Sequence, residues 1–315
     1  MSTFTKVIVG DDGLAGGADA LALARALAPT AELILASTYP WDPAPSRFAQ
    51  SGYGAIMRED TLAKLAERVR AAGLPDSVRT VAVGDSSPGR GLHRLAESEG
   101  ADLIVIGSAH HGPVGRQILG DVGRAVLHGA PCPVAVAPRA SSAPAAPQTI
   151  GVAFDHSPEA THALDVALGL AHALGASVTI RQVVAADLLP AVAGVPMINI
   201  EDLTEELRDE AQQRLDAVVA ALPDAESLTI TAEAVAGSTA DRLEELAHQV
   251  GLVVTGSRGY GSLRRVVLGS TADRLIHRSP SPVIVVPRTA VTAPLPDPAG
   301  MVDACPQPAS SSTGG

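Results

Sequence analysis

Short apolar runs recur along the chain and alternate with longer segments in which the apolar residues have helical spacing. In the first half, the apolar runs are residues 7–9, 33–36, 81–83, 103–106 and 134–136. Such runs are typical of strands that are buried on both faces of a parallel sheet. Helices are predicted over residues 17–28, around the helically spaced residues 62–69, and from Ser87-Pro88, where proline suits the first helical position. The segment 40–54, rich in Pro and Gly, is predicted to be a surface loop.

The second half repeats this alternation. Its predicted strands are residues 150–154, 178–180, 228–230, 252–254 and 283–286. Ser157-Pro158-Glu159 combines a capping residue, a proline and an acid, as at a helix start, and residues 207–222 form a long amphipathic pattern. Strands that alternate with helices form right-handed βαβ units. The sequence therefore predicts an α/β fold with parallel sheets that are covered by helices on both faces.

The two halves also match each other in sequence, which indicates a duplicated domain rather than a solenoid. Residues 103–108 match residues 252–257 at an offset of 149 residues. Near the domain starts, Asp12 matches Asp155 at an offset of 143 residues, and loop insertions would account for the difference.

The length of 315 residues suits two domains that each bury a core. We predict the first domain over residues 1–139 and the second over residues 149–288. The segment 140–148, rich in Pro, Ala and Ser, is predicted to be a linker. Residues 289–315, rich in Pro, Ser and Gly, are predicted to be a disordered tail.

Composition narrows the classes of function. Apolar residues make up 46% of the chain but aromatic residues only 2%, so the cores consist of Ala, Val, Leu and Ile, and aromatic platforms for single-stranded nucleic acid are not expected. The net charge of −11 argues against nucleic acid as a partner. We expect no membrane span, because apolar runs of about 18 residues do not occur, and no signal peptide, so the predicted location is cytoplasmic. Cys132 and Cys305 do not make a disulfide framework.

The segment 256–271 carries the strongest chemical signal. It lies between a predicted strand and an amphipathic helix and has the spacing Gly256-x2-Gly259-x9-Gly269-Ser270. Glycines let backbone amides approach an anion, and Ser270 and Thr271 would add hydroxyls at the helix N-terminus. Cations nearby are Arg258, Arg264 and Arg265. A second interpretation, compatible with the first, is that Ser270 only caps the helix and Asp273 completes a capping box.

This spacing resembles the ATP-binding signature of the universal stress protein family, in its nucleotide-binding subgroup. The resemblance covers about residues 4–138 and 148–287. It implies two tandem domains of the adenine-nucleotide α-hydrolase-like, Rossmann-like type, each with a sheet of five parallel strands. It also implies that the domains pair through their fifth strands, here as an intramolecular pseudo-dimer, which would cover the exposed apolar edges.

The resemblance also implies which residues hold the nucleotide. Asp155 would contact the nucleoside, and Val183, at the end of the second strand, would contact the adenine through its backbone. The expected binding residues of the second half are Asp155, Val183, Gly256, Ser257, Arg258, Gly259, Gly269, Ser270 and Thr271. For Asp155, capping of the following helix is the alternative role.

The first half departs from the signature. Its candidate binding residues are Asp12, Gly107 and Gly120. His110 replaces the second glycine and Asp121 replaces the serine, and a carboxylate at a helix start repels phosphate. Thr38 stands where Val183 stands in the second half. We therefore predict a weaker or absent nucleotide site in the first half.

Other candidate chemistry is weaker. His110-His111 lacks further ligands at metal-binding spacing, so loop histidines are expected rather than a metal pair. His128 and His277 occupy equivalent places near helix ends and are expected to be structural. Cys132 is expected to be a small buried residue rather than a nucleophile.

The predicted function is ATP binding, with Mg²⁺ on the phosphates, by a stress-response regulator. A general base is not evident, so little or no hydrolysis is expected and the protein is not predicted to be an enzyme. Two alternatives stay open: an interaction scaffold that binds no nucleotide, and a slow ATPase or adenylyl-transferring enzyme. Expected partners are an adenine nucleotide, a second copy in a homodimer, and a protein partner that the sequence does not identify.

Overall fold

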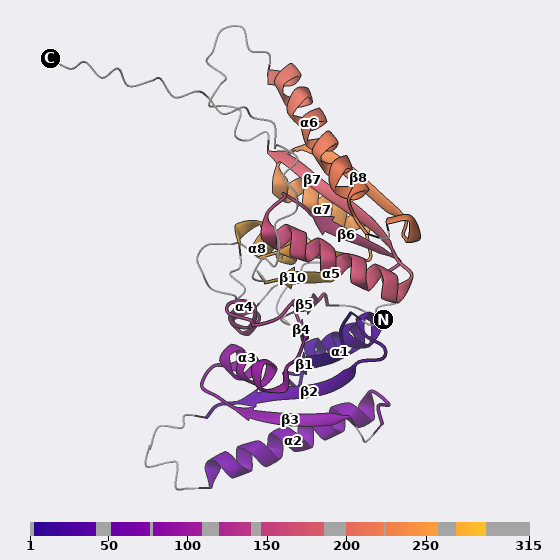
Figure 1. Ribbon diagram of the computed structural model, residues 1–315. Coiled ribbons are helices and arrows are strands. Elements are labelled where there is room, and N and C mark those ends of the chain that lie inside the picture. Colours follow the sequence, from indigo (N-terminus) through magenta and orange to yellow (C-terminus); the bar gives the residue numbers. More distant parts are fainter. Residues whose placement is uncertain are drawn as a thin grey trace, which may run out of the picture.

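The computed structural model describes residues 3–41, 52–75, 78–108, 120–139, 146–185, 200–223, 225–257 and 269–287. Strands and helices alternate through two successive halves (Figure 1). The first half consists of β1 (Lys6–Gly10), α1 (Ala15–Leu27), β2 (Glu32–Tyr39), α2 (Tyr53–Ala71), β3 (Arg79–Gly84), α3 (Pro88–Glu99), β4 (Leu103–Gly107), α4 (Asp121–Leu127) and β5 (Val134–Ala137). The second half consists of β6 (Thr149–Ala153), α5 (Pro158–Leu174), β7 (Ser177–Ala185), α6 (Ile200–Ala220), the 3-10 turn η2 (Ala225–Ser227), β8 (Ile230–Gly237), α7 (Thr239–Gln249), β9 (Leu252–Gly256), α8 (Ser270–Arg278) and β10 (Val283–Val286).

All these strands belong to one sheet, in the order β3-β2-β1-β4-β5-β10-β9-β6-β7-β8. The pairs within each half are parallel, as the alternation of strands and helices predicts. The two halves meet where β5 and β10 run antiparallel, with Val136 opposite Val283 and Val134 opposite Val285. The α/β class and the pairing through the fifth strands are thereby confirmed: the chain is a pseudo-dimer of its own two halves.

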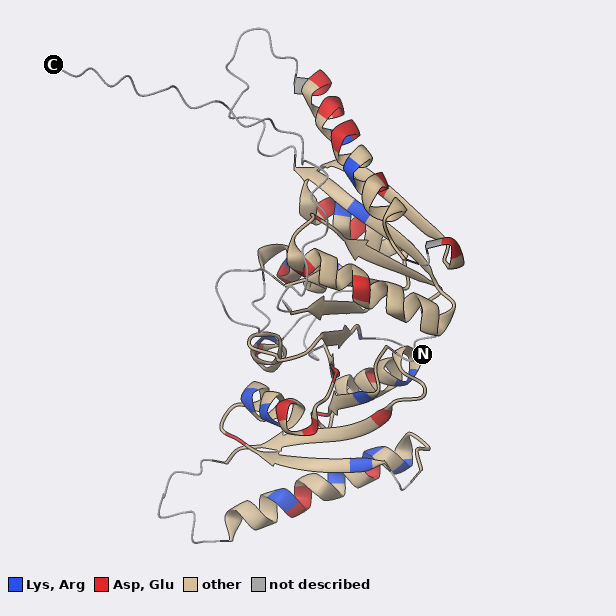
Figure 2. Ribbon diagram, in the orientation of Figure 1, with Lys and Arg blue, Asp and Glu red and all other residues tan. Residues whose placement is uncertain are grey.

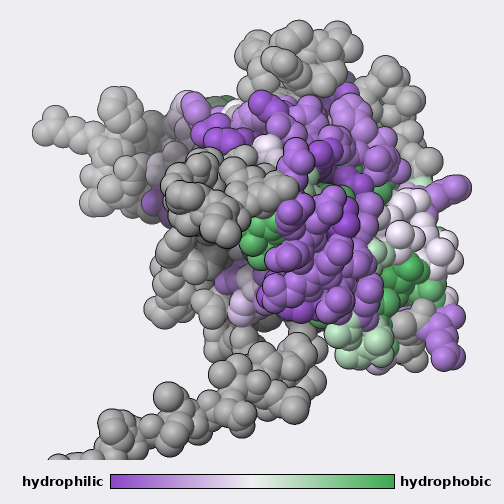
Figure 3. All heavy atoms as spheres, turned by 90° about the horizontal axis from the view of Figure 1, so that it is seen from above, coloured by the Kyte–Doolittle hydropathy of each residue, from purple (hydrophilic) through white to green (hydrophobic). Residues whose placement is uncertain are grey.

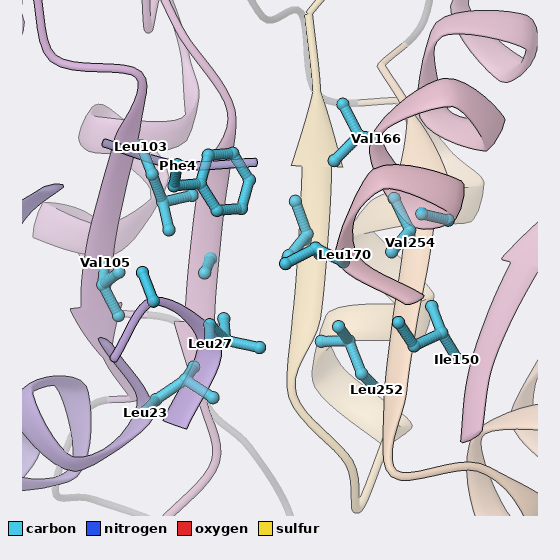
Figure 4. Close-up of a cluster of buried hydrophobic side chains, with 14 of the residues drawn as sticks. Phe4, Leu23, Leu27, Leu103, Val105, Ile150, Val166, Leu170, Leu252 and Val254 are labelled. Carbon is cyan, nitrogen blue, oxygen red and sulfur yellow. The ribbon is translucent and has the colours of Figure 1, made fainter. Parts of the chain in front are cut away.

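Helices cover both faces of the sheet (Figure 1). One buried cluster joins residues of α1, α2, α5 and α6 to their strands, and a second cluster joins residues of α3, α4, α7 and α8 to theirs. Each cluster contains residues of both halves and continues through β5 and β10. In the first cluster, Leu23 and Leu27 lie on one side of the junction and Val166 and Leu170 on the other (Figure 4). The core is thus continuous across the antiparallel junction.

Helices α2 and α6 are rich in charged residues. Figure 2 shows acids recurring along α6 and charges of both signs along α2. Seen from above, the described surface is largely hydrophilic, with apolar residues gathered in a few patches (Figure 3). The described helices include none that is long and apolar enough to cross a membrane.

Three predicted boundaries are wrong. The third strand of the second half runs over Ile230–Gly237 rather than 228–230, because its small and charged residues (Thr231, Ala232, Glu233) hide a strand from a search for apolar runs. Helix α2 already begins at Tyr53, inside the predicted loop. Strand β7 continues to Ala185, so Val183 lies two residues before the strand end.

Candidate functional site

The second half has a pocket of about 220 Å³ at the carboxyl ends of β6 and β9. In an open parallel sheet this is the edge at which ligands bind. Most of the expected binding residues that the structure describes line this pocket, namely Asp155, Val183, Gly256, Ser257, Gly269 and Thr271. Ser270 is the first residue of α8, directly between two lining residues. Arg258 and Gly259 lie outside the described residues, as do Arg264 and Arg265.

The packing of α5 requires glycine at position 256, which the spacing in the sequence did not reveal. A Cβ at this position would lie 2.7 Å from the backbone carbonyl carbon of Glu159, so α5 can pack against the end of β9 only if residue 256 is glycine. The first half repeats this relationship, because a Cβ at Gly107 would collide with the backbone of Gly16 in α1. Close packing of the first helix therefore accounts for these two glycines, whether or not a ligand is bound.

The start of α8 differs from the capping-box interpretation. Gly269 is the N-cap, in extended conformation, and Ser270 is the first helical residue. Asp273 lies with Oδ1 3.5 Å from the guanidinium of Arg124. Because glycine has no side chain to accept hydrogen bonds, the N-cap residue of α8 gives the helix no side-chain cap. The start of a nine-residue helix whose N-cap residue makes no side-chain hydrogen bond is an environment that suits an anion.

Asp155 organises the turn between β6 and α5. Its Oδ1 accepts a hydrogen bond from the amide of Ser157 at 3.0 Å. The cap of α5 is Ser157, whose hydroxyl accepts from the amide of Ala160 at 3.1 Å. The alternative role of Asp155 as the cap is therefore wrong. In the first half, Asp12 holds its turn in the same way, accepting from the amide of Leu14 at 2.9 Å.

Arg181 is the site residue that the sequence did not reveal. It lines the pocket from β7, is 5% exposed, and stands directly opposite Glu233 in the β7–β8 register. Its Nε and Nη2 donate to Oε1 of Glu233, and Nη1 donates to the backbone carbonyl of Arg242 at 2.9 Å. Nη2 also donates to Oε1 of Gln249 at 3.0 Å. All three guanidinium nitrogens thus help to hold β7, β8 and α7 together. An arginine directly after the apolar run 178–180, with a glutamate one strand later, was the available signal.

The first half has an equivalent pocket of about 540 Å³. It is lined by the three candidate residues of that half, Asp12, Gly107 and Gly120. The position of Arg181 is held here by Ala36: Ala36 pairs with Gly10 in the β1–β2 register, as Arg181 pairs with Ala153 in the β6–β7 register. A methyl group in place of a guanidinium helps to explain why the first pocket has more space.

The first half has a buried ion pair of its own beside its pocket. Asp11, which is buried, accepts from Nε of Arg68 at 2.8 Å, and this hydrogen bond raises the pKa of Arg68. Asp11 also accepts from the amide of Gly13 at 2.7 Å. The corresponding residue of the second half is Phe154, which belongs to an apolar cluster. Around these strand ends, the first half therefore has a buried charge where the second has Phe154, and it has Ala36 where the second has the buried charge of Arg181.

The other candidate residues have structural surroundings. The ring of His277 bonds through Nδ1 to the carbonyl of Asp273 at 2.7 Å, inside α8. Cys132 is buried, and burial raises the pKa of its thiol to about 12, as expected of a residue that is not a nucleophile. Groups of three or more potential metal ligands do not occur among the described residues. His110 and His111 lie outside them.

The comparisons with known proteins agree with this architecture. The model of the universal stress protein family matches residues 3–138 and again residues 147–287. A universal stress protein of Mycolicibacterium smegmatis is 34% identical over 136 residues, which cover 43% of this chain and 46% of that protein. A universal stress protein of Mycobacterium tuberculosis is 29% identical over 190 residues, covering 60% of this chain and 62% of that protein. The chain thus spans about half to three fifths of the length of these curated relatives.

A solved structure shows the same fold. The crystal structure of a universal stress protein from Archaeoglobus fulgidus covers 92% of this chain and matches over its whole length, with a TM-score of 0.61 and 20% identity. The paired family matches account for both halves of the ten-stranded sheet. The chain therefore belongs to the universal stress protein family, as a member with two tandem domains.

Proposed function

We propose that this protein binds ATP in the pocket of its second half and acts as a nucleotide-controlled regulator of the stress response. The observation that carries the proposal is the convergence of Asp155, Gly269 and Thr271 on one pocket at the carboxyl edge of the sheet. Asp155 follows β6, whereas Gly269 and Thr271 lie at the start of α8, so one side of the pocket offers a carboxylate and the other a helix start.

The nucleoside would lie against β6 and β7. Asp155 is exposed at the rim, and its Oδ2 makes no hydrogen bond among the described residues, so this oxygen is available to a ribose hydroxyl or an adenine amino group. Val183 lines the same pocket and offers its backbone beside an apolar side chain. Arg181 lies below and keeps its guanidinium in hydrogen bonds within the protein, so its role is to form the floor.

The phosphates would lie at the start of α8. The helix start, which Gly269 leaves without a side-chain cap, and the hydroxyl of Thr271 would provide donors there, and the helix dipole favours negative charge. The described residues offer no ready-made metal site of three or more ligands. Mg²⁺ would therefore be held mainly by the phosphates and water, a common arrangement for this ion.

Little or no hydrolysis is expected. Asp155 is the only carboxylate among the described lining residues, and one of its oxygens already fixes the amide of Ser157. A general base must lie within hydrogen-bond reach of the attacking water, and the role proposed for this carboxylate is contact with the nucleoside instead. We infer that ATP acts as a ligand whose presence changes what the protein binds, rather than as a substrate.

The first experiment is to measure nucleotide in the protein as purified. The protein is denatured, and the released small molecules are identified by mass spectrometry and counted per chain. About one equivalent of ATP supports a single site in the second half. Absence of nucleotide, together with no thermal shift on adding Mg-ATP, contradicts the proposal, because a ligand at 100 times its dissociation constant stabilises the fold by about 2.7 kcal/mol. That result would favour the scaffold.

A further inference from the structure

The pocket of the first half has a chemistry of its own. We propose that it binds an uncharged nucleoside, a planar ring with sugar hydroxyls and no phosphate, while the second half binds the nucleoside triphosphate. The choice of a nucleoside rests on the function proposed for the equivalent second-half pocket. The exclusion of phosphate rests on residues of the first half alone.

An unsatisfied hydroxyl marks this pocket as a binding site. Ser108 lines it and is only 4% exposed, and its Oγ is buried without a hydrogen-bond partner. Its backbone amide is already bonded to the carbonyl of Ala137 at 3.0 Å. A buried hydroxyl without a partner is costly in a folded protein, and a ligand with polar groups would satisfy it.

The mouth of the pocket is apolar. Four large apolar side chains are more than half exposed among the described residues, and two of them, Leu14 at 55% and Val122 at 52%, line this pocket. Leu92, Ile106 and Val126 add apolar walls. Exposed apolar side chains around a concave site are typical of ligand binding and suit the faces of a planar ring.

The charges oppose a phosphate group. Asp121 is the first residue of α4 and lines the pocket, where the second half has Ser270 at the start of α8. Asp12 adds a second carboxylate. Asp11 also lines the pocket, but it is paired with Arg68. Arginine and lysine are absent from the described lining, whereas carboxylates accept hydrogen bonds from sugar hydroxyls and ring amino groups.

The test uses the full chain with adenosine, AMP and Mg-ATP as probes in isothermal titration calorimetry. Adenosine is expected to bind to protein already saturated with Mg-ATP, because the two ligands occupy different halves. Ser108→Ala removes a hydroxyl that has no partner in the free protein. It should therefore weaken adenosine binding by roughly 5- to 30-fold without lowering the thermal midpoint of the ligand-free protein. Ser257→Ala makes the same change at the equivalent position of the second half and should leave adenosine binding by the first half unchanged.

Asp121→Ser is a gain-of-function variant that misfolding cannot imitate. It gives α4 the first residue that α8 has. It should raise the number of Mg-ATP molecules bound per chain from one to two, and adenosine should then compete with the second Mg-ATP. The proposal is overturned if adenosine does not bind, if Ser108→Ala leaves its affinity unchanged, or if the wild-type chain already binds two Mg-ATP. It is equally overturned if Asp121→Ser gains no ATP or AMP binding.

Failure here and failure of the proposed function give different results. If the second half binds no ATP, the adenosine titration and its dependence on Ser108 still report on the first half. If the first half binds no adenosine, the count of one Mg-ATP per chain still reports on the second.

Discussion

Arg124 and Asp273 face each other across the junction of the two halves, although they occupy the same position of the duplicated domain. Nη2 of Arg124 lies 3.5 Å from Oδ1 of Asp273, linking α4 to α8. The two residues are 149 positions apart, the offset at which the halves match in sequence. Two copies of either half would bring like charges together at this point. The unlike pair therefore favours pairing of the first half with the second.

Reversal of one charge tests this specificity. Arg124→Asp places a carboxylate beside Asp273 and should lower the free energy of unfolding by about 1 kcal/mol. Asp273→Arg should have a similar effect through the repulsion of two guanidinium groups. The double variant, Arg124→Asp with Asp273→Arg, should recover most of the loss in urea unfolding at low salt. If the two effects simply add, the pair contributes no specificity.

Ser270→Asp tests the phosphate site of the second half. The variant copies Asp121, which begins α4, so a carboxylate is tolerated at this place in the fold. It should abolish Mg-ATP binding by repelling the phosphates and leave the circular dichroism spectrum unchanged. Ser270→Ala, which adds no charge, is the control and should retain binding. Gly259→Glu should also abolish Mg-ATP binding. Unchanged affinity in the aspartate variant would remove α8 from the proposed site.

Two substitutions, at Arg181 and Glu233, would give the floor of the second-half pocket the residue types of the first half. Arg181→Ala leaves Glu233 without its partner and opens a cavity, so the free energy of unfolding should fall by about 2–3 kcal/mol. Glu233→Val added to this variant recreates the pair Ala36 and Val81, which are register partners in the first half. The double variant should be more stable than Arg181→Ala alone in chemical denaturation. A double variant that is no more stable would mean that the two pockets are not interchangeable.

The elements with long apolar runs could be predicted from the sequence, and so could the pairing of the two halves. Val134 and Val283 were placed on strands at the junction because each lies in a short apolar run that needs covering. Strand β8 was misplaced because Glu233 interrupts its apolar pattern, and the partner of Glu233 is Arg181 on another strand. Such a contact depends on register between distant segments, which a local pattern does not contain.

The site was predictable to the same degree. Asp155, Gly269 and Thr271 were expected in one pocket because strand ends and helix starts meet at one edge of a parallel sheet. The reason for Gly256 was not predictable, since it depends on how closely α5 approaches β9. The unsatisfied hydroxyl of Ser108 was hidden for the same reason, because only the packed structure shows what surrounds an atom.

Cys132 should be unreactive in the native protein. Its side chain is buried and its pKa is about 12, so the thiolate is roughly one part in ten thousand at pH 8. In the Cys305→Ser variant, a thiol reagent such as DTNB should release no colour until urea unfolds the chain, after which one equivalent should react. Rapid labelling without denaturant would show that the segment before β5 opens readily.

Ionisation of Asp85 should make the free energy of unfolding depend on pH in the acidic range. Its carboxylate is almost fully buried and accepts from Nη2 of Arg90 at 2.7 Å and from the amide of Ser87 at 3.0 Å, and Arg94 lies 3.0 Å away. The hydrogen bond from Arg90 is the main cause that holds the pKa of Asp85 below its usual value of 3.8.

A pKa that is lowered by folding stabilises the native state while the carboxylate is ionised. The contribution of Asp85 is therefore complete above about pH 5. It declines as the pH falls through the usual value of 3.8 toward the lower folded-state pKa. Asp85→Asn should cost about 1–3 kcal/mol at pH 7, and the difference from wild type should shrink below pH 4. Asp60→Asn, which removes an exposed pair with Lys64, is the control and should cost less than about 0.5 kcal/mol. A difference between Asp85→Asn and wild type that stays constant from pH 7 to pH 3 would show that packing of the side chain, rather than its charge, supplies the stabilisation.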